Sequence, residues 1–162
     1  MTSAPQVQVK VARLQTHAQF EAVLQQSVSI SNFYFVLHYG ASKLSTEPQQ
    51  EKLQSVDNLF FQGSRLGLII PKRWAKRAVT RSLVKRQCRA QFALAAADLP
   101  AGDWIIRLRR SLDSGQWNSA SSPALKQHVR QEIQHLLAQA QQRWSKEHSY
   151  PSEQVLIKGA SC

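Results

Sequence analysis

The chain has 162 residues, a formal net charge of +11 at pH 7 and two cysteines. This length suits a single domain with tails, and an isoelectric point near 10.3 indicates an anionic partner, with nucleic acid favoured over a membrane surface. The two cysteines make no disulfide framework, no apolar run is long enough to span a membrane, and residues 1–10 lack the features of a signal peptide. We therefore expect a reduced, cytoplasmic protein.

The first regular element is predicted by a capping box. Thr16 can cap a helix, and Gln19, three residues later, can reach back to the cap. The pattern predicts a helix that runs to about Gln26, with Phe20 and Leu24 on one face.

The alternating segment 32–38 predicts a strand. One side would carry three apolar residues and the other a mixed set: Phe33, Phe35 and Leu37 against Tyr34, Val36 and His38. Because both sides are apolar or aromatic, the strand must be covered on both, or must offer one face to a ligand. Residues 40–62 are polar and predict a long flexible connection.

The segment 65–97 carries the most informative pattern. Leu66–Ile70 is a short branched run that predicts a strand, which ends at Pro71 because proline cannot donate to a sheet. Trp74–Ala97 contains no Gly or Pro and predicts a helix. An apolar seam follows from helical spacing: Val84, Cys88, Phe92 and Ala95.

Cations lie on the other side of this helix. Lys85, Arg86 and Arg89 fall roughly 100–200° from the seam. Four cations repeat every fourth residue: Arg77, Arg81, Lys85 and Arg89. Like charges at this spacing repel each other on an isolated helix, so the row becomes favourable when a polyanion neutralises it. The alternative is a solvated basic face with no partner.

The basic charge is concentrated in this region. Residues 64–110 hold 12 of the 21 Lys and Arg but only two acidic residues, whereas the rest of the chain has nine basic and eight acidic residues. Nearly all of the net charge therefore belongs to one strand–helix–strand unit.

The remaining elements complete the domain. Residues 99–103 predict a turn, and Trp104–Leu108 predicts a strand parallel to the one before the basic helix. Ser122 and Pro123 predict the start of a helix to about Trp144. Its apolar stripe is expected to be core: Leu125, Val129, Ile133, Leu136 and Leu137.

Four motifs together carry a family pattern: Arg65-Leu-Gly-Leu, Lys72-Arg73, the helical segment AVTRSLVKRQCR (78–89), and Leu99-Pro-Ala-Gly-Asp followed by Trp-Ile-Ile. They resemble the protein component of bacterial ribonuclease P, over roughly residues 10–142. Cations that match the helical signature are Arg81, Lys85, Arg86 and Arg89. Ser82 and Leu83 stand where the family has Asn and a second Arg, so we expect Leu83→Arg to tighten RNA binding.

The resemblance implies an α+β fold. We expect a single-domain α/β sandwich with a mixed four-stranded sheet and an unusual left-handed βαβ crossover, like the second domain of ribosomal protein S5. The domain would span residues 11–144 with a flexible insertion at 40–62, between flexible tails at 1–10 and 145–162.

The resemblance also implies an accessory subunit of an endoribonuclease, whose catalytic RNA removes the 5′ leader from precursor tRNA. Cations would bind that RNA: Arg65, Lys72, Arg73, Lys76, Arg77, Arg81, Lys85, Arg86 and Arg89. A cleft would hold the leader: Phe20, Tyr34, Val36 and His38. Mg²⁺ would be bound mainly by the RNA, and no membrane or further protein partner would be required.

Two other functions remain open at this point. A ribosomal or assembly-type RNA-binding protein of similar fold would share the basic helix but need no leader cleft. A protein nuclease would use His38 as a base and cleave without an RNA subunit. The sequence shows no Gly-rich phosphate loop, and no metal-ligand spacing or carboxylate pair. We therefore expect no catalytic or metal-binding residue in the protein.

Overall fold

The computed structural model describes residues 11–148 except 27, 42–62, 113–116, 118 and 120–121. The predicted tail 1–10, almost all of the predicted insertion 40–62, and residues 149–162 lie outside this part. The described elements are, in chain order, β1 (Val11–Arg13), α1 (His17–Gln25), β2 (Val28–Ser31), β3 (Phe35–Gly40), β4 (Ser64–Ile69), α2 (Ala78–Ala95), β5 (Asp103–Leu108) and α3 (Pro123–His148).

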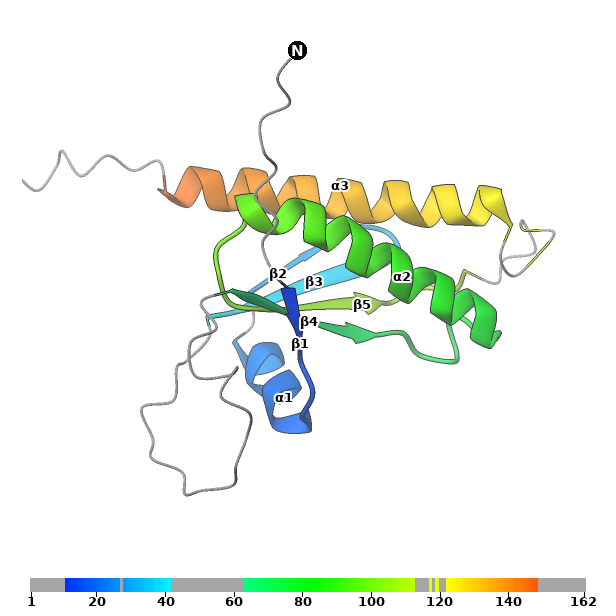
Figure 1. The fold of residues 1–162 in the computed structure, drawn as a ribbon, viewed down its shortest axis with the longest axis horizontal. Coiled ribbons are helices and arrows are strands. Elements are labelled where there is room, and N and C mark those ends of the chain that lie inside the picture. The colour runs from blue at the N-terminus through cyan, green and yellow to red at the C-terminus, as the bar shows by residue number, and fades with distance from the viewer. Residues whose placement is uncertain are drawn as a thin grey trace, which may run out of the picture.

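The strands form one mixed sheet in the order β1-β4-β5-β3-β2. β4 pairs parallel with β1 and β5, and β3 pairs antiparallel with β5 and β2. Figure 1 shows α2 and α3 side by side on one face of the sheet and α1 on the other. The α+β sandwich and the parallel β4–α2–β5 unit are confirmed, while the handedness of the crossover and the likeness to ribosomal protein S5 stay predictions. The sheet has five strands rather than four, because Val11–Arg13 pairs along the outer edge of β4.

A hairpin replaces the single strand predicted over 32–38. The side-chain Oδ1 of Asn32 accepts hydrogen bonds from the backbone N–H groups of Tyr34 (3.1 Å) and Phe35 (2.8 Å), which closes a turn between β2 and β3. β3 therefore begins at Phe35. Phe35 and Leu37 are buried as predicted, whereas Phe33 projects from the turn and is 56% exposed.

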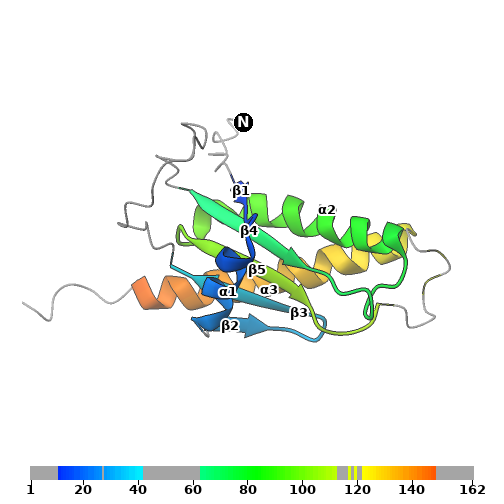
Figure 2. The same cartoon turned by 90° about the horizontal axis from the view of Figure 1, so that it is seen from below.

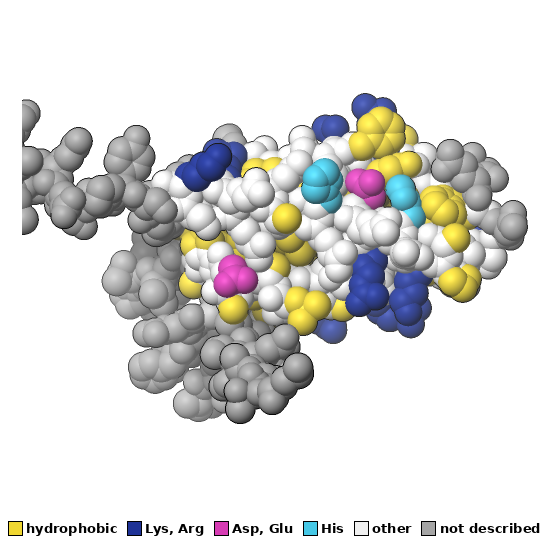
Figure 3. All heavy atoms as spheres, turned by 90° about the horizontal axis from the view of Figure 1, so that it is seen from above, with side chains coloured by type: hydrophobic (Ala, Val, Ile, Leu, Met, Phe, Trp, Pro, Cys, Tyr) yellow, Lys and Arg dark blue, Asp and Glu magenta, His cyan; other side chains and the backbone are white. Residues whose placement is uncertain are grey.

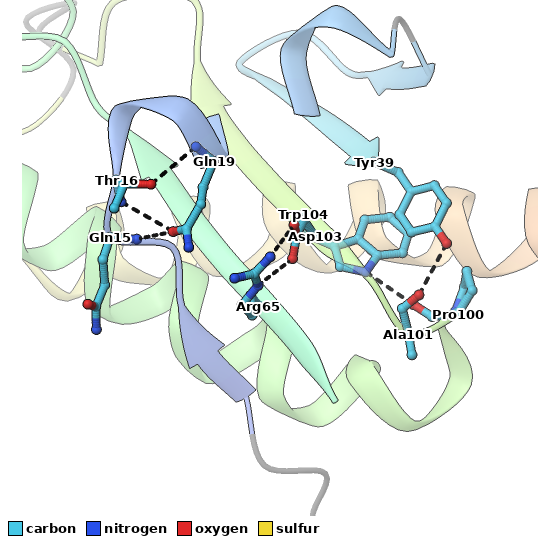
Figure 4. A network of polar contacts seen from close by, with 9 residues as sticks. All are labelled: Gln15, Thr16, Gln19, Tyr39, Arg65, Pro100, Ala101, Asp103 and Trp104. Carbon is cyan, nitrogen blue, oxygen red and sulfur yellow. Dashed lines mark hydrogen bonds and ion pairs between the residues drawn. The ribbon is translucent and has the colours of Figure 1, made fainter. Parts of the chain in front are cut away.

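The main core lies between the sheet and the α2–α3 layer. The predicted seam of α2 and the predicted stripe of α3 are both buried, which confirms them. Trp104 of β5 is fully buried at the centre. Its ring contacts the tilted ring of Tyr39 and meets that of Trp144 edge-on. Its Nε1 donates to the carbonyl oxygen of Pro100 at 3.2 Å (Figure 4). Since each of these groups comes from a different segment, the core fixes α3 against β3 and β5.

Local capping signals give the helix starts correctly in two cases. In α1, Thr16 Oγ1 accepts from the N–H of Gln19, and Gln19 Oε1 accepts from the N–H of Thr16 (Figure 4). In α3, Ser122 Oγ accepts from the N–H of Leu125 at 3.1 Å. α3 continues to His148, so the predicted tail begins later than residue 145.

α2 begins at Ala78 rather than at Trp74. Its N-cap is Arg77 in an extended conformation, and Arg81 Nη1 donates to the carbonyl oxygens of Ala75 (3.0 Å) and Lys76 (2.7 Å). These bonds tie the first turn of α2 to the carbonyl groups of the residues that precede the helix. The cations before residue 78 therefore belong to a loop rather than to the helix.

α1 packs closely on the other face of the sheet. A Cβ built on Gly67 of β4 would lie 2.6 Å from Phe20 Cε1 and 2.9 Å from Leu14 Cδ1. Only glycine leaves room for the ring at this distance. Phe20, Leu24 and Ile69 pack against a small buried cluster formed by Leu14, Val23 and Ile105. No helix in the described part of the chain is long and apolar enough to cross a membrane.

Candidate nucleic-acid interface

The cations of α2 and of the loop before it form one surface, which we call the α2 basic surface. Its loop members are all exposed: Lys72, Arg73, Lys76 and Arg77. Its helix members are Lys85, Arg86 and Arg89, which lie away from the buried seam, and Arg81, which borders it. Figure 3 looks onto the α2–α3 layer and shows Lys and Arg gathered at the edge where α2 lies. No acidic residue occurs between 72 and 97, so these charges have no local counter-charge on the same segment.

The start of α2 concentrates this positive potential. The helix has no side-chain cap and no acidic residue in its first turn. Its N-terminal amides carry the positive end of the helix dipole, and Arg77 and Arg81 add to it instead of compensating it. Such an arrangement is unfavourable in the free protein and becomes favourable when an anion such as a phosphate group binds there.

Arg81 has a structural role in addition to its positive charge. Its Nη1 holds the loop carbonyls of Ala75 and Lys76, while a guanidinium also carries three N–H groups on Nε and Nη2. One side chain can therefore shape the loop and still present donors to a phosphate.

Arg65 differs from the other predicted RNA-binding cations. It lies opposite Asp103 on neighbouring strands, and its Nε and Nη2 donate to the two carboxylate oxygens at 2.7 Å each (Figure 4). Its side chain is only 29% exposed, and that of Asp103 is 10% exposed. Because this bidentate pair uses the charge of Arg65 inside the protein, the structure does not support a phosphate contact for this residue.

The burial of Leu83 contradicts a second expectation. It is 3% exposed and belongs to the main core. The buried side of α2 extends beyond the predicted seam to include Leu83 and Gln91, and Gln91 accepts a hydrogen bond from Gln134 of α3 at 2.9 Å. The expectation that Leu83→Arg would tighten RNA binding is therefore wrong, because position 83 faces protein.

Three of the four residues predicted to form the leader cleft share the α1 face of the sheet. Val36 and His38 alternate with the buried residues of β3, and their partners across the strands are Arg107 and Ile105. Phe20 of α1 covers Gly67 on the same face. Figure 2 shows that α1 crosses only one end of this face, and Val36, His38 and Arg107 are half-buried beside it.

Tyr34 lies elsewhere. Its ring contacts His128 of α3 edge-on, at 5.1 Å between ring centroids, and packs against the core on the α2–α3 side. The prediction that Tyr34 lines the same cleft as Val36 and His38 is wrong, because the turn at Asn32 breaks the alternation on which it relied.

Arg107 is a residue of this face that the sequence patterns missed. Alternation along β5 could have found it, since Trp104, Ile106 and Leu108 are core residues and Arg107 falls between two of them. Burial, and secondarily the charge of Arg107, lower the pKa of His38 below its ordinary value of 6.5. His38 is therefore neutral at pH 7, and its buried Nε2 has no hydrogen-bond partner among the described residues.

The described residues do not fit a metal site held by the protein. No three His, Cys, Asp or Glu residues cluster within the part of the chain that the structure describes, and the carboxylate of Asp103 is bound by Arg65. The free thiol of Cys88 is buried, and burial raises its pKa to about 12. It is therefore a core side chain rather than a nucleophile.

Comparison with known proteins gives a consistent result. A family model described as Ribonuclease P matches residues 9–141. The ribonuclease P protein component of Paraburkholderia xenovorans is 40% identical over 90 residues, which is 56% of this chain and 65% of the relative. That of an Azoarcus species is 33% identical over 119 residues, or 74% and 81% of the two chains. In the matches to Bordetella parapertussis and Bordetella bronchiseptica, the chain spans 53% of the relative's length.

Solved structures share the fold. The ribonuclease P protein of Staphylococcus aureus is 22% identical, with a TM-score of 0.56 over 81% of this chain and 96% of that one. The protein from Thermotoga maritima is 21% identical, with a TM-score of 0.53 over 78% and 96%. The family match covers most of the chain, and the chain therefore belongs to the ribonuclease P protein family.

Proposed function

We propose that this chain is the RNA-binding accessory subunit of a bacterial ribonuclease P, acting in the cytoplasm on precursor tRNA. The α2 basic surface docks on the catalytic RNA, and the α1 face of the sheet holds the 5′ leader. The RNA carries the chemistry and the Mg²⁺. The observation that carries this proposal is the α2 basic surface itself, a row of cations on a segment without acidic residues (72–97) in a member of this family.

The mechanism is electrostatic and geometric. Lys and Arg side chains bind phosphates and release counterions, and arginine can do so bidentately. Neutralising the backbone charge of the RNA lowers the Mg²⁺ concentration that the RNA needs for activity. On the other face, Phe20, Val36 and the neutral ring of His38 offer apolar and aromatic contacts to unpaired bases without reading their sequence. Arg107 lies beside them and can bind a leader phosphate.

The docking is tested by Arg86→Ala. Arg86 is exposed on α2, so its loss should leave the fold intact, weaken binding to ribonuclease P RNA, and make the slope of log K against log salt shallower by about one unit. Arg143→Ala is the matched control, because Arg143 is also exposed but reaches Ser29 of β2, at the opposite edge of the sheet. An unchanged slope for Arg86→Ala would rule out its phosphate contact.

The leader face is tested with the reconstituted holoenzyme. Affinities are measured for precursor tRNA and for mature tRNA, which lacks the leader. Arg107→Ala should reduce the preference for precursor and leave mature tRNA binding unchanged, since only the leader reaches this face. An equal loss for both RNAs would show that Arg107 does not contact the leader.

A further inference from the structure

A pocket opens at the end of the sheet where β4 and β5 finish, next to the turn that precedes β3. Its volume is about 460 Å³, within the range of roughly 300–1,000 Å³ for small-ligand sites. Two aromatic rings, two arginines and a serine line it: Phe33, Trp74, Arg109, Arg110 and Ser111. We call it the Phe33–Trp74 pocket.

The walls of the pocket are fixed by hydrogen bonds between its three loops. The N–H of Arg109 donates to the carbonyl oxygen of Tyr34 at 2.9 Å, and Arg109 Nε donates to that of Phe33 at 3.3 Å. The N–H of Leu112 donates to the carbonyl oxygen of Trp74 at 2.9 Å. Both rings are therefore carried on backbone that is anchored to its neighbours, so the pocket needs little ordering before it binds a ligand.

The side chains of the pocket combine exposed rings with cations. Phe33 is more than half exposed although it is a large apolar residue, and the guanidinium of Arg110 lies 4.3 Å from its ring centroid. The guanidinium of Arg73 lies 5.0 Å from the ring of Trp74. None of the described residues that line the pocket carries a carboxylate. Rings alone would suit an apolar ligand and cations alone a bare anion, whereas the combination suits a base attached to a phosphate.

We infer that the Phe33–Trp74 pocket binds a single unpaired nucleotide of the catalytic RNA. The base stacks on the exposed ring of Phe33, and Arg109 and Arg110 bind the adjacent phosphates. This inference rests on the proposed function. Trp74 lies in the loop that carries Lys72–Arg77 of the α2 basic surface, so an RNA docked on that surface passes the mouth of the pocket. This proximity assigns the nucleotide to the catalytic RNA rather than to the leader.

The stacking is tested by two substitutions of Phe33 in the full-length chain. Phe33→Tyr keeps an aromatic face, whereas Phe33→Leu keeps an apolar side chain without one. Affinity is measured for a ribonuclease P RNA transcript at several salt concentrations. Phe33→Leu should bind on the order of 5- to 100-fold more weakly with an unchanged salt slope, because no phosphate contact is lost. Phe33→Tyr should bind like the wild type. Leu94→Ala, at an exposed leucine on α2 outside the pocket, is the control and should have no effect.

Any other result of these affinity measurements would contradict a specific part of the inference. Equal affinities for Phe33→Leu and wild type would overturn the pocket while leaving the proposed function intact. Equal losses in Phe33→Leu and Phe33→Tyr would show a packing role instead of stacking. If the only effect is a smaller preference of the holoenzyme for precursor over mature tRNA, the pocket binds the leader. That result would contradict our assignment of the nucleotide to the catalytic RNA. Failure of the wild type to bind the transcript would instead overturn the proposed function.

Discussion

Substitutions at two adjacent positions of α2 distinguish what the core contributes to stability from what the surface contributes to RNA binding. Ser82 and Leu83 both depart from the family pattern, yet Ser82 is exposed and Leu83 is 3% exposed. Ser82→Asn and Leu83→Arg each restore the family residue. We expect a large loss of stability from Leu83→Arg and almost none from Ser82→Asn, because residue 83 lies in the core and residue 82 is exposed to solvent.

The magnitude follows from burial. Truncating a buried leucine costs about 2–5 kcal/mol, and an arginine at this position must also desolvate its charge or displace its neighbours to reach water. A domain of this size is stable by roughly 5–15 kcal/mol, so Leu83→Arg should remove a large part of the free energy of unfolding. With about 2–4 °C per kcal/mol, its Tm should fall by roughly 10 °C. Ser82→Asn should change the free energy of unfolding by less than about 0.5 kcal/mol.

The assay is urea and thermal unfolding of both variants followed by circular dichroism, with RNA affinity corrected for the folded fraction. Leu83→Arg should be unstable and should not bind RNA more tightly than the wild type. A Leu83→Arg protein as stable as the wild type that binds RNA more tightly would refute the placement of residue 83 in the core.

Two further predictions concern the α1 face. Gly67→Ala should cost about 1–3 kcal/mol, because its Cβ would lie 2.6 Å from Phe20 Cε1. In a Phe20→Ala background the cost should fall but not vanish, because Leu14 Cδ1 would still lie 2.9 Å from this Cβ; equal costs in both backgrounds of a double-mutant cycle would exclude the clash with Phe20. Arg107→Gln should raise the pKa of His38 measured by NMR, although not fully to 6.5, since burial is the larger cause; a fall in that pKa would contradict the electrostatic contact. Because the folded state lowers this pKa, the unfolded chain binds the proton first as the pH falls, so the contribution of His38 to stability is present above about pH 6.5 and is lost below it. A His38→Gln variant should lose that part of the pH dependence.

Features set by local sequence were predictable. The capping box at Thr16, the cap at Ser122 and the apolar stripes of α2 and α3 depend on residues within one or two turns of each other, and all are present in the structure. The helical part of the α2 basic surface was predictable for the same reason, since helical spacing alone separates Arg86 from the seam, whereas the loop before Ala78 was predicted as helix.

Features set by contacts between distant segments were not predictable in this way. The placement of Tyr34 depends on the turn at Asn32, whose side-chain amide also donates to the carbonyl oxygen of Glu132 in α3. The burial of Leu83 depends on how α2 packs in the main core, and the pairing of Arg65 with Asp103 depends on the register between β4 and β5. In each case the sequence identified the chemical type of the side chain, but it could not show which residues of other segments surround it.

The most direct test of the proposed function is cleavage of precursor tRNA at low Mg²⁺ by a bacterial ribonuclease P RNA, with and without this protein. We predict that RNA alone is nearly inactive under these conditions, that the protein restores correct 5′ maturation, and that the protein alone cleaves nothing. Restoration should be weaker with Arg86→Ala and unchanged with Arg143→Ala. If the protein binds the RNA tightly yet leaves cleavage unaffected, the accessory-subunit account is contradicted, and the α2 basic surface serves another RNA.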